Sequence, residues 1–235
     1  QSLKVDVWFF KKPQLRGNNS ATPRSPKFGA SLSREDHMKR VFIVSIGILL
    51  GALDFGDFQS QAEWSYPSEK DDSKFPAVIL IHGSTPADMD FTVMGPDGQP
   101  KSSIFKDIAH ALAGQGIATL RYNKHYVNGL NQVDYQRFYA KADLPLFLKD
   151  AEIAFKAAEN NPRIDSQRIY IYGWSEGSVV AAALVSMHPE VRGLILQGPV
   201  SLPFRETFEE QFKQVQLPYL RSIAGDALKN EDFAK

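Results

Sequence analysis

The chain of 235 residues contains no cysteine. It can therefore form no disulfide framework, offers no thiolate nucleophile and has no cysteine-based metal site. Its 27 basic and 27 acidic residues balance to a formal net charge of +0, which gives no indication of a nucleic acid or an anionic membrane as a partner. The sequence also has no internal repeat, and no motif in it indicates a cofactor or a bound metal. Its hydrophobic content of 43% and charged content of 23% are ordinary for a soluble globular protein.

Long hydrophobic runs are scarce. The run at residues 41–53 has 13 residues and is too short for a transmembrane helix, which needs about 20. It follows Met38 and two basic residues, and this order is typical of a secretory signal peptide at residues 38–62, with cleavage after Ala62. Met38 would then be the natural start, residues 1–37 a disordered or non-native upstream segment, and the protein secreted or periplasmic in a bacterium. The alternative is that residues 41–53 form a buried strand or helix of the domain.

From residue 57 to residue 235 the pattern predicts one domain in which strands alternate with helices. Continuous apolar runs predict buried strands, and apolar residues at helical spacing predict helices between them. Such an alternation favours an α/β fold, with a doubly wound, mostly parallel sheet and helices on both faces. The strands are predicted at residues 75–81, 116–122, 168–172 and 191–197, and the helices at residues 104–114, 142–160 and 203–212.

The most informative motif is Gly173-Trp174-Ser175-Glu176-Gly177. A β-branched and aromatic run precedes it and a small-residue helical pattern follows it, as in the strand, sharp turn and helix of a nucleophile elbow. Glycines are needed on both sides because the turn is strained and neighbouring chains approach closely. The pattern predicts Ser175 as a catalytic nucleophile.

A second motif, His82-Gly83-Ser84, follows the first buried strand. A glycine there lets the backbone approach a substrate, so that the next N–H can point at a developing negative charge. We expect the N–H groups of Ser84 and Glu176 to form an oxyanion hole. We interpret His82 as a turn histidine that transfers no proton.

From about residue 58 to residue 211 the chain resembles the α/β-hydrolases, especially the bacterial serine esterases related to dienelactone hydrolase and prolyl-oligopeptidase-type domains. The resemblance rests on residues 82–90 (HGSTPADMD), 105–109 (FKDIA), 120–124 (LRYNK) and 173–177 (GWSEG). In that group Thr85 is commonly glycine, Asn123 aspartate and His125 arginine. The resemblance implies hydrolysis of a small-molecule carboxylic ester through an acyl-enzyme. The alternatives are a peptidase or thioesterase on the same scaffold, or a non-catalytic binding protein on a decayed hydrolase fold.

The rest of the catalytic triad is not evident. In α/β-hydrolases the acid and then the histidine follow the serine along the chain. The only histidine after Ser175 is His188, which we expect at the far end of the next helix. The acidic candidates fall in predicted lid or connector helices at residues 201–235 or near the terminus: Glu206, Glu209, Glu210, Asp226, Glu231 and Asp232. The family also leads us to expect two further strands after residue 197. We therefore predict a C-terminally incomplete, truncated hydrolase domain that lacks its acid and histidine and has little or no activity alone.

Overall fold

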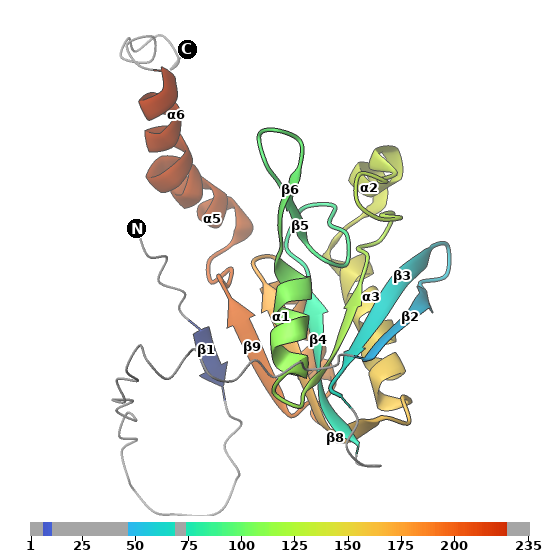
Figure 1. Ribbon diagram of the computed structural model, residues 1–235. Coiled ribbons are helices and arrows are strands. Elements are labelled where there is room, and N and C mark those ends of the chain that lie inside the picture. Colours follow the sequence, from blue (N-terminus) through green and yellow to red (C-terminus); the bar gives the residue numbers. More distant parts are fainter. Residues whose placement is uncertain (1–6, 11–46, 69–73, 225–235) are drawn as a thin grey trace, which may run out of the picture.

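The computed structural model describes residues 7–10, 47–68 and 74–224 (Figure 1). A seven-stranded sheet has the order β1-β9-β8-β4-β7-β3-β2. Its four middle strands, β9, β8, β4 and β7, run parallel, whereas β1, β2 and β3 join antiparallel. The strands are β1 Val7–Phe10, β2 Gly47–Asp54, β3 Gln59–Tyr66, β4 Phe75–Ile81, β7 Ala118–Tyr122, β8 Ile164–Trp174 and β9 Gly193–Gln197.

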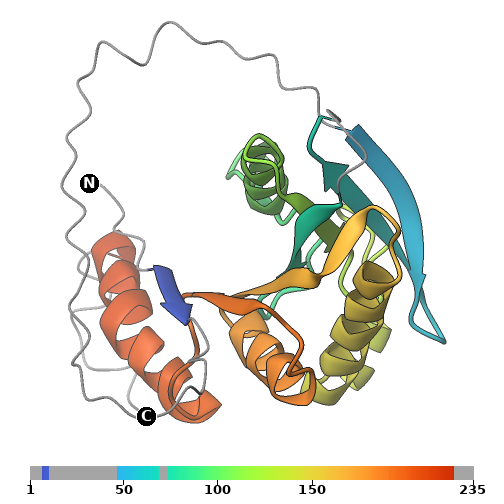
Figure 2. The same cartoon turned by 90° about the horizontal axis from the view of Figure 1, so that it is seen from below.

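Helices cover both faces of this sheet. Figure 2 shows α1 on one side and α3 and α4 on the other. A separate two-stranded hairpin, β5 and β6, precedes α1, and α5, η2 and α6 extend away from the sheet (Figure 1). The bounds are β5 Thr92–Met94, β6 Pro100–Ser103, α1 Ile104–Ala113, α2 Tyr135–Lys141, α3 Leu144–Glu159, α4 Gly177–Met187, α5 Phe204–Gln211, the π-helical η2 Phe212–Gln216 and α6 Leu217–Ala224.

The core lies on the two faces of β4, where successive side chains point in opposite directions. Ile79 and Ile81 pack with the apolar residues of α3 and α4. Val78 and Leu80 pack instead with Phe105 of α1. Burial on both faces explains why this segment reads as a continuous apolar run rather than an alternating one.

The predicted fold class and its strand–helix alternation are confirmed. β4 has the predicted bounds, and α1, α3, α5, β7 and β8 lie within a few residues of their predicted positions. One expectation is wrong. The strand at residues 191–197 was predicted to be buried, but every residue of β9 is only half-buried. β9 is the second strand from one edge of the sheet, with β1 as its outer neighbour. Fewer residues therefore pack against it than against β4 or β8.

The sheet includes chain that precedes the predicted start at residue 57. β2 pairs with β3 along its whole length, from Gly47 to Asp54, as an outer strand whose side chains are exposed except for Leu53. The predicted cleavage site after Ala62 falls within β3. The signal peptide stays a prediction, and residues 38–46 and most of residues 1–37 lie outside the described part. Among the described helices, none has the length and apolar character needed to cross a membrane.

Candidate active site

Ser175 occupies a sharp turn between β8 and α4. Its backbone has φ = 52°, in the left-handed region that residues with a side chain rarely adopt. A Cβ atom on Gly173 would lie 2.5 Å from the carbonyl oxygen of Gly177, and one on Gly177 would overlap the carbonyl oxygen of His82. Glycine is therefore required at both positions by close backbone approach. The predicted strand, strained turn and helix are all present.

The loop after β4 lies directly against this turn. A Cβ atom on Gly83 would be 3.3 Å from Cβ of Ser175 and 3.8 Å from its Oγ. Ser84 follows in the chain, and Glu176 precedes the first residue of α4, where N–H groups have no partner within the helix. Within the described residues, neither the Ser84 N–H nor the Glu176 N–H donates a hydrogen bond. Two backbone N–H groups without a partner in the described chain thus belong to residues that follow Gly83 and Ser175 directly in the sequence.

His82 is buried beneath this loop. Its Nε2 lies 3.0 Å from the carbonyl oxygen of Asp88, which can only accept, so Nε2 carries the proton. The ring also packs on Phe105, with 4.7 Å between centroids. Burial lowers the pKa of His82 to about 3 and keeps the imidazole neutral. These contacts support a structural role for His82.

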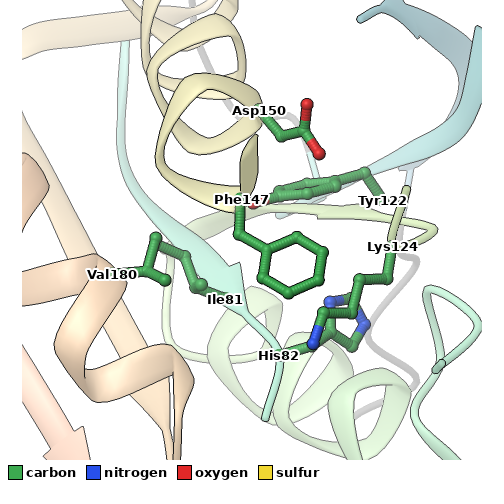
Figure 3. Close-up of a pocket in the computed structure, with 7 residues that line it drawn as sticks. All are labelled: Ile81, His82, Tyr122, Lys124, Phe147, Asp150 and Val180. Atoms are coloured by element: carbon green, nitrogen blue, oxygen red, sulfur yellow. The ribbon is translucent and has the colours of Figure 1, made fainter. Parts of the chain in front are cut away.

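Lys124 follows β7 and connects the two loops around Ser175. Its Nζ donates to the carbonyl oxygen of Gly83 and lies 3.0 Å from Oε2 of Glu176. The ammonium group also lies 3.9 Å from the centre of the Phe147 ring. The Lys124 side chain is 6% exposed, and burial lowers its pKa although the Glu176 carboxylate opposes that shift. Figure 3 shows it beside Phe147 and His82 at the edge of a small cavity.

Sequence reasoning missed this role of Lys124, which it used only as part of the family resemblance. The available signal was a lysine directly after a buried strand, combined with an acidic residue directly after the predicted nucleophile. The sequence does not show that these two residues are in contact, because 52 positions separate Lys124 from Glu176 in the chain.

The acidic stretch after the His82 loop is held by β7 and its continuation. Arg121, whose side chain is fully buried, forms ion pairs with Glu63 of β3 and with Asp90. The side-chain oxygen of Asn123 accepts a hydrogen bond of 2.7 Å from the N–H of Met89. An aspartate at position 123 could accept the same hydrogen bond. The presence of Asn123 instead of aspartate therefore leaves this contact with the Met89 loop intact.

His125 stands where the esterases that the sequence resembles commonly have arginine. Its Nδ1 lies 2.9 Å from the carboxylate of Asp150, and its Nε2 lies 3.2 Å from Asp57. Burial raises the pKa of Asp150. Both ring nitrogens of His125 are therefore occupied by carboxylates, and neither is available to Ser175.

His188 lies at the far end of α4, as predicted. The helix has 11 residues, so about 16 Å of helix separates His188 from Ser175. The His188 ring packs on Phe155 and its Nδ1 lies 3.0 Å from Glu190. His110 is on α1. Neither His125 nor His188 is therefore placed to take a proton from Ser175.

The acidic candidates are no closer. Glu206, Glu209 and Glu210 lie on α5, which has no buried residue and extends away from the sheet (Figure 1). Asp226, Glu231 and Asp232 lie outside the described residues. After β9 the described chain contains the helical elements α5, η2 and α6 and no strand as far as residue 224. Nor does any cluster of three or more histidine, aspartate or glutamate side chains among the described residues form a metal site.

A cavity of about 360 Å³ adjoins the loop that carries Ser84. Its walls come from this loop, from the β5 strand and from the segment before α2. Exposed apolar side chains contribute to it, and they include Val93, Met94 and Leu130. The cavity is lined by residues 85–88, 91–94, 129–131, 133 and 135.

The parallel central sheet, the helices on both faces and the serine at a strained turn after β8 define an α/β-hydrolase fold. The sequence model of the serine aminopeptidase family S33 matches residues 98–228, and the chain belongs to this family. Over 159 residues it is 34% identical to Esterase EstD of Thermotoga maritima, a match that covers 68% of this chain and 35% of the esterase. The chain thus spans about a third of the length of this relative.

Two solved structures are also similar. A hypothetical protein of Pseudomonas aeruginosa aligns with a TM-score of 0.49 and 16% identity, over 85% of this chain and 61% of its own. Est1E of Butyrivibrio proteoclasticus aligns with a TM-score of 0.43 and 19% identity, over 60% of this chain and 47% of its own.

Proposed function

We propose that this chain carries the nucleophile and the oxyanion hole of a serine hydrolase that cleaves small carboxylic esters through an acyl-enzyme. Ser175 is the nucleophile, and the N–H groups of Ser84 and Glu176 are the oxyanion donors. The observation that carries the proposal is the left-handed backbone of Ser175, in contact with the loop whose Ser84 N–H, like that of Glu176, has no acceptor among the described residues. Strained backbone of this kind persists where the surrounding structure enforces it, and it concentrates at active sites.

In the proposed reaction, Ser175 Oγ attacks the ester carbonyl carbon and loses its proton to a base. The carbonyl oxygen becomes an oxyanion that accepts hydrogen bonds from the Ser84 and Glu176 N–H groups. Collapse of this intermediate expels the alcohol, which takes up a proton, and leaves an acyl group on Ser175. Attack by water then releases the acid and restores the serine. Each oxyanion donor of this kind contributes about 10²–10³ in rate.

The base and its acidic partner are not among the groups placed near Ser175. A serine hydroxyl is a weak nucleophile at neutral pH without an adjacent base. We therefore propose that the base and the acid come from outside the described residues, and that the chain alone hydrolyses esters slowly. The residual rate left by an oxyanion hole and binding alone is about 10³–10⁴ over water.

Ester hydrolysis is favoured over two alternatives. The relative with 34% identity is named as an esterase, which supports an ester substrate. The family description names an aminopeptidase, so a peptide or thioester substrate on the same scaffold is the second candidate. A non-catalytic binding protein is disfavoured because the strained serine and both glycines of the elbow are retained.

Acylation of the serine tests this function directly. The chain is incubated with p-nitrophenyl acetate, and the acetyl group is located by mass spectrometry of its peptides. We expect slow acetylation at Ser175 and none at that peptide in Ser175→Ala. Ser186→Ala is the matched control, because Ser186 is an exposed serine on α4, and it should behave as the unmodified chain. Equal acetylation of the Ser175→Ala peptide would contradict the proposal.

A further inference from the structure

We propose that Lys124 is a positioning residue that fixes the direction of the Ser84 N–H donor and compensates the carboxylate of Glu176, the residue that carries the second donor. This inference rests on the proposed function, because it assigns Lys124 a role in the same site. A single buried ammonium group contacts the backbone of one donor loop and the side chain of the other.

The first contact orients the Ser84 N–H. The carbonyl group of Gly83 and the N–H of Ser84 belong to one planar peptide unit and point in opposite directions. Because Lys124 donates to the Gly83 oxygen, the direction of the Ser84 N–H is fixed as well. The loop needs such an anchor, since glycine adopts more backbone conformations than other residues and this peptide could otherwise rotate.

The second contact acts at Glu176. This residue contributes one donor N–H but also carries a carboxylate that is only partly exposed, with 16% of the side chain accessible. A negative charge so close to a developing oxyanion would oppose its formation, and the effect is large where water is excluded. Lys124 holds the carboxylate 3.0 Å from its own charge and thereby compensates it.

The surroundings of Lys124 keep it in one place. Its ammonium group lies over the Phe147 ring, and its side chain is almost completely buried (Figure 3). An aromatic face attracts a cation, and burial excludes water that could compete for the ammonium protons. The ammonium protons are directed to Gly83 and Glu176, so Lys124 acts on the reaction through these two residues and not as its base.

The test measures acetylation of Ser175 by p-nitrophenyl acetate as a function of ester concentration. In Lys124→Met we expect the limiting rate constant to fall about 100-fold, as when an oxyanion donor is lost, while the half-saturating concentration stays within about threefold. If Lys124 had a purely structural role, its replacement would not lower the limiting rate constant while leaving the half-saturating ester concentration unchanged. Lys156→Met is the matched control, because Lys156 is an exposed lysine paired with Glu159 on α3, and its rate should be unchanged.

A second variant covers a failure to fold. Lys124→Met leaves the Glu176 carboxylate partly buried without its partner, whereas the double variant Lys124→Met/Glu176→Gln removes both charges and still lacks the Gly83 contact. Circular dichroism shows which of the two variants is folded. Each folded variant should have a limiting rate constant well below that of the unmodified chain. A folded variant that acetylates within about threefold of the unmodified chain would overturn the inference alone. No acetylation of Ser175 in the unmodified chain would instead overturn the proposed function, and the inference with it.

Discussion

Ile171 lies in β8 at the middle of the sheet, opposite Ile79 of β4 and Leu194 of β9, and its side chain is fully buried. Its replacement by aspartate removes a buried aliphatic group, which costs about 2–5 kcal/mol when isoleucine is truncated to alanine. An unpaired carboxylate in the same place costs several kcal/mol more. The sum approaches or exceeds the total stability of an ordinary domain, about 5–15 kcal/mol. We therefore expect Ile171→Asp to be unfolded at 25 °C.

Urea denaturation measures this effect through the fluorescence of Trp64 and Trp174, which are both partly buried. Ile171→Val should remain folded and lose only about 0.5–1.5 kcal/mol, because it deletes a single methylene group. Gln167→Asp places the same carboxylate at an exposed position of β8 and should change the stability by about 0.5 kcal/mol or less. An Ile171→Asp protein with an unchanged midpoint would show that β8 does not form the core.

Three further predictions concern activity, pH and export. Any esterase activity of the chain should disappear in Ser175→Ala and be unaffected by His188→Ala, measured with p-nitrophenyl acetate; loss of activity in His188→Ala would refute the placement of that residue. His82 has a pKa of about 3 in the folded chain and about 6.5 when unfolded, so its contribution to stability is complete above pH 6.5 and is lost as the pH falls towards 3. Between pH 7 and pH 5 the unfolding free energy should fall by up to about 2 kcal/mol more in the unmodified chain than in His82→Gln, and equal falls would contradict a neutral buried His82. Expressed from Met38 in a bacterium, the protein should be exported and lose its first segment, as N-terminal sequencing would show; an intact N-terminus found only in cytoplasmic material would exclude the signal peptide.

The strands of the core were predictable because a strand that is buried on both faces has a continuous run of apolar residues. The bounds of β4 follow from its apolar run alone. The β5–β6 hairpin was not predicted, because its strands are short and largely exposed and have no such run. Helix α2 was missed for a similar reason: it has seven residues and only Phe138 among them is buried.

The side-chain contacts of the site were predictable only where they follow from a local motif. Gly173, Ser175 and Gly177 form a local motif with a local physical cause, so their arrangement could be read directly from the sequence. The contact between Lys124 and Glu176, by contrast, is made by the parallel pairing of strands that brings β7, β4 and β8 together. Such a contact depends on the register of the sheet and not on any spacing along the sequence.

The elbow itself argues for a functional serine. A left-handed backbone at a residue with a side chain costs on the order of 1–3 kcal/mol. Here the strain is maintained by close packing: Gly173 against Gly177, and Gly177 against the carbonyl oxygen of His82, distances that leave no room for a Cβ atom. A scaffold that served only for binding would gain stability by relaxing this turn. A strained serine near two N–H groups that have no acceptor among the described residues fits the proposed nucleophile and oxyanion hole.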